Sequence, residues 1–449
     1  MEEKIYQLAD SIEKYNSIDK SFYKKFDIRR GLRNKDGTGV LVGITAVGDV
    51  KGYDRADDKI IPIEGNLYYR GYSVLDIVKD IKKDNRFGFE EVIYLLLFNK
   101  LPTKEALEKF KKILIEQRRL PDRFLEDVLL KVPGDNIMNK MMRSMLTLYS
   151  FDANPDSIDT FNVLNQSISL ISKLPLIMGY AYQAKRHYLD GQSLVIHFPY
   201  EDRSMAENIL HIIRNNDDYS DLEAKVLDLL LILHAEHGGG NNSAFATHVV
   251  TSSGTDTYSA IATGLASLKG PRHGGANLKV KEMLDDIKAN VGDINDLSKL
   301  EEYLKKMLDK KAFDNKGLIY GLGHAVYTLS DPRALLLKEQ AKKLAKEKGM
   351  KEEYEFIENV EKIGARLVQE KNKAEYASCA NIDMYSGFVY QMLGIPEELY
   401  TPLFAVSRMS GWAAHRLEQI LDEKIIRPAY KSISNLREYE PFSERREDD

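Results

Sequence analysis

Apolar residues recur at helical spacing through most of this chain, from about residue 75 to residue 422. Side chains three or four positions apart lie on one face of a helix, so this spacing predicts amphipathic helices that bury that face. The segment 89–97 is almost continuously apolar and is stopped by Pro102. The other segments with helical spacing are 4–26, 103–117, 136–150, 162–185, 203–215, 222–236, 256–268, 277–289, 296–309, 333–349, 351–372, 384–393 and 401–422. We therefore predict an all-α fold.

A short N-terminal stretch departs from this pattern. Asp36-Gly37 opens a β-prone run at residues 40–47, and Gly65-Asn66 stands between the runs 59–63 and 67–72. Short β-prone runs joined by turn residues are typical of hairpins. Small β-hairpins are thus the only strands that we expect.

The chain has 449 residues, enough for two or three domains, with no repeat of fixed period and no Ser- or Pro-rich linker. Its 64 basic and 69 acidic residues are interspersed, which argues against a nucleic-acid-binding surface. A single cysteine, Cys379, permits no intrachain disulfide and favours a reducing compartment. The N-terminus does not resemble a signal peptide, and no apolar run is long enough to span a membrane. We expect a cytoplasmic protein.

The stretch Gly270–Asn277 places His273 in a glycine turn directly before a helical segment that begins near Leu278. The positive end of a helix macrodipole disfavours an imidazolium, so the imidazole there should be neutral. A neutral imidazole can donate a hydrogen bond to a substrate carbonyl, as enolising enzymes require. An ordinary loop histidine is the alternative interpretation of the same pattern.

A second histidine cluster, His234-Ala235-Glu236-His237, ends an apolar helical segment and runs into Gly238–Gly240. The glycines would let His237 and the backbone approach a ligand closely. His-x-x-His can also indicate a metal site, and a metal-dependent hydrolase that uses His234 and His237 is one alternative function. Zinc sites normally need three or four ligands at familiar spacing, however, and this stretch lacks them. We expect no metal.

Two further clusters contain residues suited to catalysis. His324 follows a Gly-x-Gly sequence and lies nine residues before Arg333, close enough for both to flank a small anion. Asp383 opens an apolar helical segment, where the local pattern favours the role of helix N-cap. A cap would have a low pKa, so a base at Asp383 would need burial. Arg408 and Arg427 stand beside apolar residues and could bind carboxylates in bidentate geometry.

Together these clusters resemble the citrate synthase family. The resemblance runs from about residue 36 to 430 and is specific because seven modest motifs occur in the family's order. They are His-Ala-Glu-His-Gly-Gly-Gly-Asn, Gly-Pro-Arg-His-Gly-Gly-Ala-Asn, Gly-Leu-Gly-His-Ala-Val, Asp-Pro-Arg, Asn-Ile-Asp-Met-Tyr-Ser-Gly, Ser-Arg and Arg-Pro.

The resemblance implies a two-domain helical fold. Residues 1–277 would form the first part of a large domain, 278–388 a small domain, and 389–449 the C-terminal part of the large domain. It also implies a homodimer in which Arg427 enters the neighbouring active site.

The resemblance also implies the roles of the site residues. Asp383 would remove a proton from the acetyl-CoA methyl group, His273 would stabilise the enol, and His324 would polarise the keto group of oxaloacetate. Oxaloacetate would be bound by His237, Arg333, Arg408 and Arg427. The CoA adenine would be bound by the backbone of Leu318, Ile319, Tyr320, Gly321, Leu322 and Gly323.

The expected activity is therefore citrate synthesis from acetyl-CoA, oxaloacetate and water, without a metal or prosthetic group. Oxaloacetate binding should close the domains before acetyl-CoA binds. A 2-methylcitrate synthase that takes propionyl-CoA is the rival within the family, since one methylene changes discrimination by only about 1–3 kcal/mol. A non-catalytic CoA or dicarboxylate sensor is the alternative outside catalysis.

Overall fold

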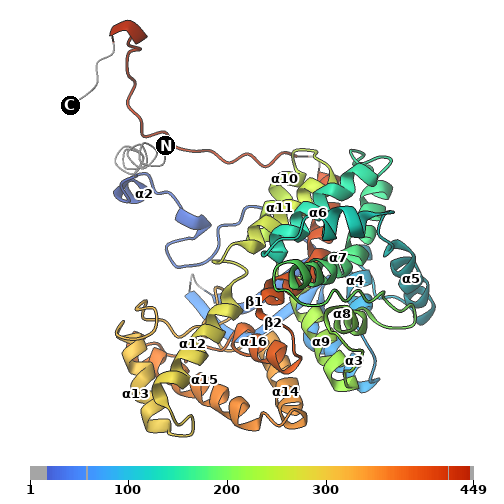
Figure 1. The fold of residues 1–449 in the computed structure, drawn as a ribbon. Helices are drawn as coiled ribbons and strands as arrows, with labels where there is room; N and C mark the ends of the chain where they lie inside the picture. Colours follow the sequence, from blue (N-terminus) through green and yellow to red (C-terminus); the bar gives the residue numbers. More distant parts are fainter. Residues whose placement is uncertain (1–17, 57–58, 423, 445–449) are drawn as a thin grey trace.

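The computed structural model describes residues 18–56, 59–422 and 424–444 of a largely helical protein (Figure 1). Its helices are α2 Ser21–Lys25, α3 Val74–Lys83, α4 Phe89–Phe98, α5 Lys104–Gln117, α6 Ile137–Leu148, α7 Thr160–Tyr188, α8 Met205–Ile213, α9 Asp221–His234, α10 Asn242–Thr251, α11 Thr257–Lys269, α12 Ala276–Val291, α13 Leu297–Leu308, α14 Pro332–Glu347, α15 Lys351–Asn372, α16 Asp383–Met392 and α17 Tyr400–Asp422. Short helical turns are η1 Arg30–Leu32, η2 Leu125–Leu130, η3 Tyr149–Phe151, η4 Glu397–Leu399 and η5 Phe442–Glu444. The predicted all-α class is confirmed.

Most predicted helices lie within a few residues of their observed bounds, because side-chain caps fix where they begin. Ser204 and Ser220 each form a capping box at the start of α8 and α9, and Asp159 caps α7. The predicted segments cover neither α3 nor α10, and the first residues of α10 belong to the polar Gly-Asn stretch after His237. Of the helix expected at 4–26, residues 4–17 lie outside the described residues, and α2 occupies part of the remainder.

The strands form one small antiparallel sheet of order β1-β2-β3, with β1 Gly48–Ala56, β2 Lys59–Tyr69 and β3 Tyr72–Ser73. The hairpin expectation is right in kind and wrong in detail. Gly65-Asn66 is no turn, since it lies inside the continuous strand β2. Gly65 serves close packing instead: a Cβ there would lie 2.0 Å from the carbonyl oxygen of Ser330.

The run at 40–47 is not a strand either. Leu41 and Ile44 are almost fully exposed, and the nearest ladder is an isolated bridge between Arg33 and Gly39. A β-prone run forms a strand only when a neighbouring strand pairs with it and its apolar side chains are covered. Among the described residues no strand pairs with the run, and Val47 is its only fully buried apolar side chain.

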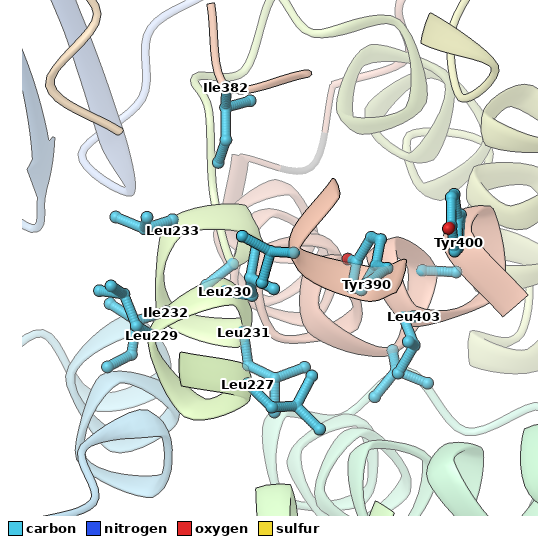
Figure 2. Close-up of a cluster of buried hydrophobic side chains, with 14 of the residues drawn as sticks. Leu227, Leu229, Leu230, Leu231, Ile232, Leu233, Ile382, Tyr390, Tyr400 and Leu403 are labelled. Atoms are coloured by element: carbon cyan, nitrogen blue, oxygen red, sulfur yellow. The ribbon is translucent and has the colours of Figure 1, made fainter. Parts of the chain in front are cut away.

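The main core surrounds α17, which packs against α4, α7, α9, α10 and α11. Its single tryptophan, Trp412, is completely buried. Figure 2 shows leucines of α9 beside α16 and the start of α17, where Tyr390 and Leu403 complete the cluster. This packing fixes the C-terminal end of α9 against α17.

The helices α12 to α16 pack mainly with one another and form the lower part of the view in Figure 1. The β1–β2 hairpin lies between them and the remaining helices. The domain bounds 1–277, 278–388 and 389–449 stay a prediction. Among the described residues, no helix has both the length and the hydropathy that crossing a membrane requires.

Candidate active site

Two buried arginines bring the residues singled out from the sequence into one place. The charge of Arg333 acts on His237, His324 and Asp383. The charge of Arg408 acts on His237 and His273. Charge effects of this kind fall off with distance, and the ring contacts agree. The Arg333 guanidinium lies 5.5 Å from the Tyr327 ring, and the Phe404 ring lies 4.7 Å from the Arg408 guanidinium and 6.5 Å from the His273 ring, so these side chains lie around a common point. They come from α14, α16, α17 and the turns that follow α9, α11 and residue 323.

His237 lies at the centre of this group. Its ring centroid is 5.1 Å from that of His324 and 5.7 Å from that of Tyr327. Burial and then the charge of Arg333 place the pKa of His237 well below its usual range. Its Nε2 atom is buried and has no hydrogen-bond partner among the described residues. A neutral imidazole with an unsatisfied nitrogen is suited to a polar ligand.

The backbone fixes the tautomer of His324. Its Nδ1 atom accepts hydrogen bonds from the amides of Val326 and Tyr327, both at 3.1 Å. In a neutral ring, Nδ1 therefore has no hydrogen and Nε2 carries it. Burial and then Arg333 lower the pKa of His324 to about 4, so the ring is neutral at physiological pH. His324 thus presents an N–H donor.

Asp383 is the first residue of α16, and Ile382 occupies the N-cap position. The N-cap interpretation of Asp383 is wrong, because its side chain caps no helix amide. Asn381 Oδ1 instead accepts the amide hydrogen of Asp383 at 3.0 Å. Burial raises the pKa of Asp383 to about 6, against the opposing charge of Arg333. Burial thus supplies the basicity that a capping position would have removed.

The loop 318–323 is tied to the segment before Asp383. Gly323 donates to the carbonyl of Cys379 at 2.8 Å, and Asn381 donates from its backbone to Gly321 at 2.9 Å. Asn381 Nδ2 also donates to the carbonyl of Gly323 at 3.0 Å. These bonds fix the position of the His324 turn relative to α16. Leu318 is half exposed, whereas Ile319 is buried.

His273 faces a serine that the sequence analysis did not select. Its Nε2 atom lies 3.0 Å from Ser243 Oγ. That hydroxyl accepts a hydrogen bond from Trp412 Nε1 and lies 2.9 Å from Asn241 Oδ1. Ser243 donates its one hydroxyl hydrogen to Asn241 Oδ1, so it accepts from His273 Nε2, which carries the hydrogen of the neutral ring. Burial and then the charge of Arg408 lower the pKa of His273 to about 4, and α12 begins three residues later, as expected.

The two arginines are held in different ways. Arg333 is paired with Asp331, which also caps α14, through Nε at 3.0 Å and Nη2 at 2.7 Å. Arg408 donates from Nε to the carbonyl of His234 at 2.6 Å, while Nη1 and Nη2 are buried without a partner. Burial lowers the pKa of Arg408 to about 10, so it remains charged. Its free guanidinium edge can receive a carboxylate in bidentate geometry.

Arg427 is the one arginine of the proposed set that a single chain does not bring to this group. It lies in the extended segment after α17 and lines a cavity with Phe22, Phe26 and Phe245. That cavity, formed by the two end segments of the chain, has a volume of about 880 Å³. The role of Arg427 in a neighbouring site stays a prediction.

The arrangement does not favour the hydrolase alternative. Among the described residues, the one group of three potential metal ligands is His248, His415 and Glu418. It includes neither His234 nor His237. His234 Nδ1 lies 3.0 Å from the carbonyl of Leu230, within its own helix.

The sequence analysis missed Ser243, Glu236 and His415. Ser243 carries no pattern of its own. His415 could have been found, because it lies within the apolar run of α17, where an ionisable side chain needs a buried partner. Its partner is Glu236, whose carboxylate lies 3.0 Å from His415 Nε2.

Comparison with known proteins agrees with this arrangement. A family model described as "Citrate synthase, C-terminal domain" matches residues 36–429. The chain belongs to the citrate synthase family. It is 34% identical to citrate synthase 2 of Bacillus subtilis over 82% of this chain and 90% of that protein. It is 32% identical to 2-methylcitrate synthase 1 of Corynebacterium glutamicum over 93% of this chain and 98% of that protein.

Solved structures give the same family. The crystal structure of citrate synthase from Thermotoga maritima matches with a TM-score of 0.72 and 30% identity, over 92% of this chain and 99% of that one. A citrate synthase from Thermoplasma acidophilum matches with a TM-score of 0.73 and 27% identity, over 93% of this chain and 99% of that one. The latter structure is a ternary complex with carboxymethyl coenzyme A and oxaloacetate.

Proposed function

We propose that this protein is a citrate synthase, which condenses acetyl-CoA with oxaloacetate and water to give citrate and CoA. The observation that carries the proposal is the convergence of His273, His324 and Asp383 around the charges of Arg333 and Arg408. Two neutral imidazoles and one carboxylate of raised pKa form the set that enolisation and carbonyl addition require.

Oxaloacetate binds first, to His237, Arg333 and Arg408. Arg408 offers one carboxylate its Nη1 and Nη2 atoms, which have no hydrogen-bond partner in the part of the chain that the structure describes. Arg333 binds the other without leaving Asp331. His324 donates from Nε2 to the keto oxygen and makes the keto carbon more electrophilic. Closure of the domains around oxaloacetate would then exclude water before acetyl-CoA binds.

Enolisation follows at the acetyl group. Asp383 removes a methyl proton while the neutral His273 ring donates a hydrogen bond to the thioester oxygen, where negative charge develops. A thioester methyl group is a very weak acid, so neither residue is sufficient alone. The enol carbon then bonds to the keto carbon, and the new alkoxide takes a proton from His324. Water hydrolyses the citryl thioester and releases CoA.

No metal or prosthetic group enters these steps, and we propose that none is needed. The backbone of residues 318–323 would bind the adenine of CoA. The hydrogen bonds from Gly323 to Cys379 and from Asn381 to Gly321 support this placement, because they fix the loop beside Asp383.

We propose further that the enzyme is a homodimer completed by Arg427 of the neighbouring chain. The extended segment that contains Arg427 exposes large apolar side chains, including Tyr430 and Leu436, which are almost fully accessible in a single chain. Apolar surface of this kind is normally covered in an assembly. A two-fold dimer would bring each such segment onto its neighbour.

The dimer proposal is tested by complementation between two inactive variants. Asp383→Asn and Arg427→Gln should each inactivate the homodimer. In a co-expressed heterodimer, one site has both changes and the other has neither, so about a quarter of wild-type activity should return in an equal mixture. Full inactivity of isolated heterodimers would contradict a shared site.

The activity itself is tested by CoA release with oxaloacetate and either acetyl-CoA or propionyl-CoA. A higher kcat/KM with acetyl-CoA supports citrate synthase. A higher value with propionyl-CoA would assign the 2-methylcitrate activity, which the curated relatives also include. Oxaloacetate binding without release of CoA from either thioester would support the sensor alternative.

A further inference from the structure

Directly behind Arg408 lies a buried set of ionisable side chains that the proposed reaction does not use. Glu236 and His415 are completely buried, and His248 is 9% exposed. His415 Nε2 lies 3.0 Å from Glu236 Oε2, and His415 Nδ1 lies 3.0 Å from His248 Nε2. Glu236 directly precedes His237 in the chain, so this set adjoins the candidate active site.

One hydrogen bond and one ion-pair contact at its two ring nitrogens assign a positive charge to His415. His248 Nδ1 lies 2.9 Å from Gln419 Oε1, an acceptor, so the hydrogen of the His248 ring is on Nδ1. His248 Nε2 is then a bare acceptor and requires a hydrogen on His415 Nδ1. Glu236 Oε2 lies 3.0 Å from His415 Nε2, at ion-pair distance although outside hydrogen-bond geometry. A bare Nε2 lone pair would repel the carboxylate at that distance, so Nε2 also carries a hydrogen. A ring with hydrogens on both nitrogens is an imidazolium.

The groups around His415 agree with that charge. Besides Glu236 and His248, a second carboxylate from its own helix faces it: Glu418 Oε2 lies 3.9 Å from His415 Nδ1. Arg70, which follows β2, lies 4.0 Å from the other oxygen of Glu418. Burial alone would keep His415 neutral, but Glu236 and Glu418 together outweigh burial and raise the pKa of His415 to about 9.

Glu236 also lies close to Arg408. A Cβ at Gly411 would meet Glu236 Oε2 at 2.5 Å and Arg408 Cδ at 3.4 Å, so both side chains pack on the same glycine. Each also shifts the pKa of the other, as opposite charges do at short range. Nevertheless the Arg408 Nη1 and Nη2 atoms have no partner, because the carboxylate points to His415 instead.

Glycines hold the pair in this arrangement. A Cβ at Gly48 would lie 2.7 Å from Glu236 Cγ, so any larger residue there would clash with Glu236. The glycine lets the start of β1 pack directly on this side chain. Gly239, in the turn after His237, lies against the rings of both His415 and His248. The turn that would bind oxaloacetate therefore rests directly on the histidine pair.

We propose that His415 is a positioning residue that holds Glu236 away from Arg408 and so leaves the guanidinium free for a carboxylate of the substrate. Without the imidazolium, Glu236 would pair with the nearest buried cation, which is Arg408. It would then compete with oxaloacetate for the same Nη atoms. The identity of the substrate in this inference rests on the proposed function. The competition of Glu236 for the Arg408 Nη atoms rests on the geometry alone.

A metal between the two rings is the main alternative, because His248, His415 and Glu418 could supply three ligands. The separation of 3.0 Å between the ring nitrogens matches an N–H···N hydrogen bond. A stoichiometric transition metal in the purified protein, with loss of oxaloacetate affinity on chelation, would overturn the proposal.

The first test measures oxaloacetate binding by calorimetry, and initial rates, in the full-length His415→Gln variant. We expect the dissociation constant to rise by about 10- to 100-fold, the range for losing a charge-assisted contact. At saturating oxaloacetate, kcat should remain within about threefold of wild type, since no reacting atom is touched. Unchanged affinity would overturn the proposal.

The rescue variant separates competition from a general loss of packing. In Glu236→Gln/His415→Gln the competing charge is absent, so affinity should return to within about threefold of wild type. His211→Gln, at a buried histidine of α8 that pairs with Asp217, is the matched control and should bind as wild type does. A double variant as weak as His415→Gln would show that only packing was lost, which overturns the proposal.

Two further measurements test the positioning role, one through the pH dependence of the wild-type protein and one through a crystal structure that needs no bound substrate. In wild type, oxaloacetate affinity should weaken as the pH rises through about 9, where His415 loses its proton, and Glu236→Gln should abolish this change. In a crystal of unliganded His415→Gln, Glu236 should contact Arg408. If wild type binds no oxaloacetate yet this contact forms, the substrate assignment fails and the positioning role stands; if the contact is absent, the positioning role fails.

Discussion

The site contains histidines in two layers, a half-buried front layer and a fully buried back layer, whose pKa values shift in opposite directions at His273 and His324 compared with His415. In the front layer, His273 and His324 line the candidate active site, and each has its pKa lowered to about 4. In the back layer, the pKa of His415 is raised to about 9. Burial favours the neutral form in all three. His415 differs because Glu236 lies 3.0 Å from it, whereas the largest charge effects on His324 and His273 come from Arg333 and Arg408.

The protonation state of these histidines therefore follows from the charged side chains beside them and not from the extent of their burial alone. Neutral front-layer rings can donate to a carbonyl without losing a proton to solvent, which suits enol chemistry. A charged ring there would repel Arg333 and Arg408. The charged ring of His415, behind these arginines, pairs with Glu236, whose carboxylate would otherwise bind Arg408.

The largest expected effect comes from removing the one anionic base among the front-layer groups. Asp383→Asn should lower kcat by about 10²- to 10⁴-fold, because a neutral amide cannot accept the methyl proton. Oxaloacetate affinity should change little, since Arg333 and Arg408 are retained. Rapid-quench rates and calorimetry measure the two quantities. Weak oxaloacetate binding in this variant would mean that Asp383 mainly supports the structure.

The two layers should respond to pH in opposite directions. The raised pKa of His415, from 6.5 to about 9, contributes about 3 kcal/mol of stability below pH 6.5, which is lost as the pH rises through about 9. The lowered pKa values of His273 and His324 act oppositely, and stability falls as the pH drops from about 6.5 toward 4. Urea unfolding over this pH range measures both changes.

The matched control for the alkaline change is His415→Gln. The difference in unfolding free energy between wild type and this variant should shrink by about 3 kcal/mol between pH 6.5 and pH 9.5. Parallel curves for the two proteins would show that His415 is not charged in the folded state.

Activity should show an acid limb that belongs to Asp383 and not to the front-layer histidines. Asp383 must be ionised to accept a proton, so kcat/KM should fall about tenfold per pH unit below about 6. The histidines with a pKa of about 4 remain neutral through that range. A pH–rate profile that stays flat down to pH 5 would place the base elsewhere.

The smallest effect is expected at Cys379, beside the front layer. Burial raises the pKa of its thiol to about 11, so little thiolate exists at physiological pH. Cys379→Ala should keep kcat within about twofold of wild type, and iodoacetamide at pH 8 should inactivate the enzyme slowly. Rapid inactivation that Cys379→Ala prevents would assign the thiol a position in the site.

Local pattern predicted much of this molecule correctly. Helical spacing located α5 to α9 and α11 to α17, since a helix shows its buried face in its own sequence. Glycine turns marked the segments of His237, His273 and His324. Strand pairing was harder, because whether the run 40–47 forms a strand depends on partners elsewhere. Gly65 likewise looked like a turn residue, although its reason is the close approach of Ser330.

The sequence by itself therefore determined which segments are helical and, through the order of its motifs, the family of the chain. Only the tertiary structure decided the charges. The local pattern of Asp383 indicates a helix cap of low pKa, whereas burial raises the pKa of its carboxyl group in the folded protein. The local pattern of His415 shows only a residue of an apolar helix, whereas Glu236 lies 3.0 Å from it in the structure. The protonation state of a side chain depends on its exposure to solvent and on charged residues that are distant in the sequence but close in the fold. The residues next to it in the sequence show neither.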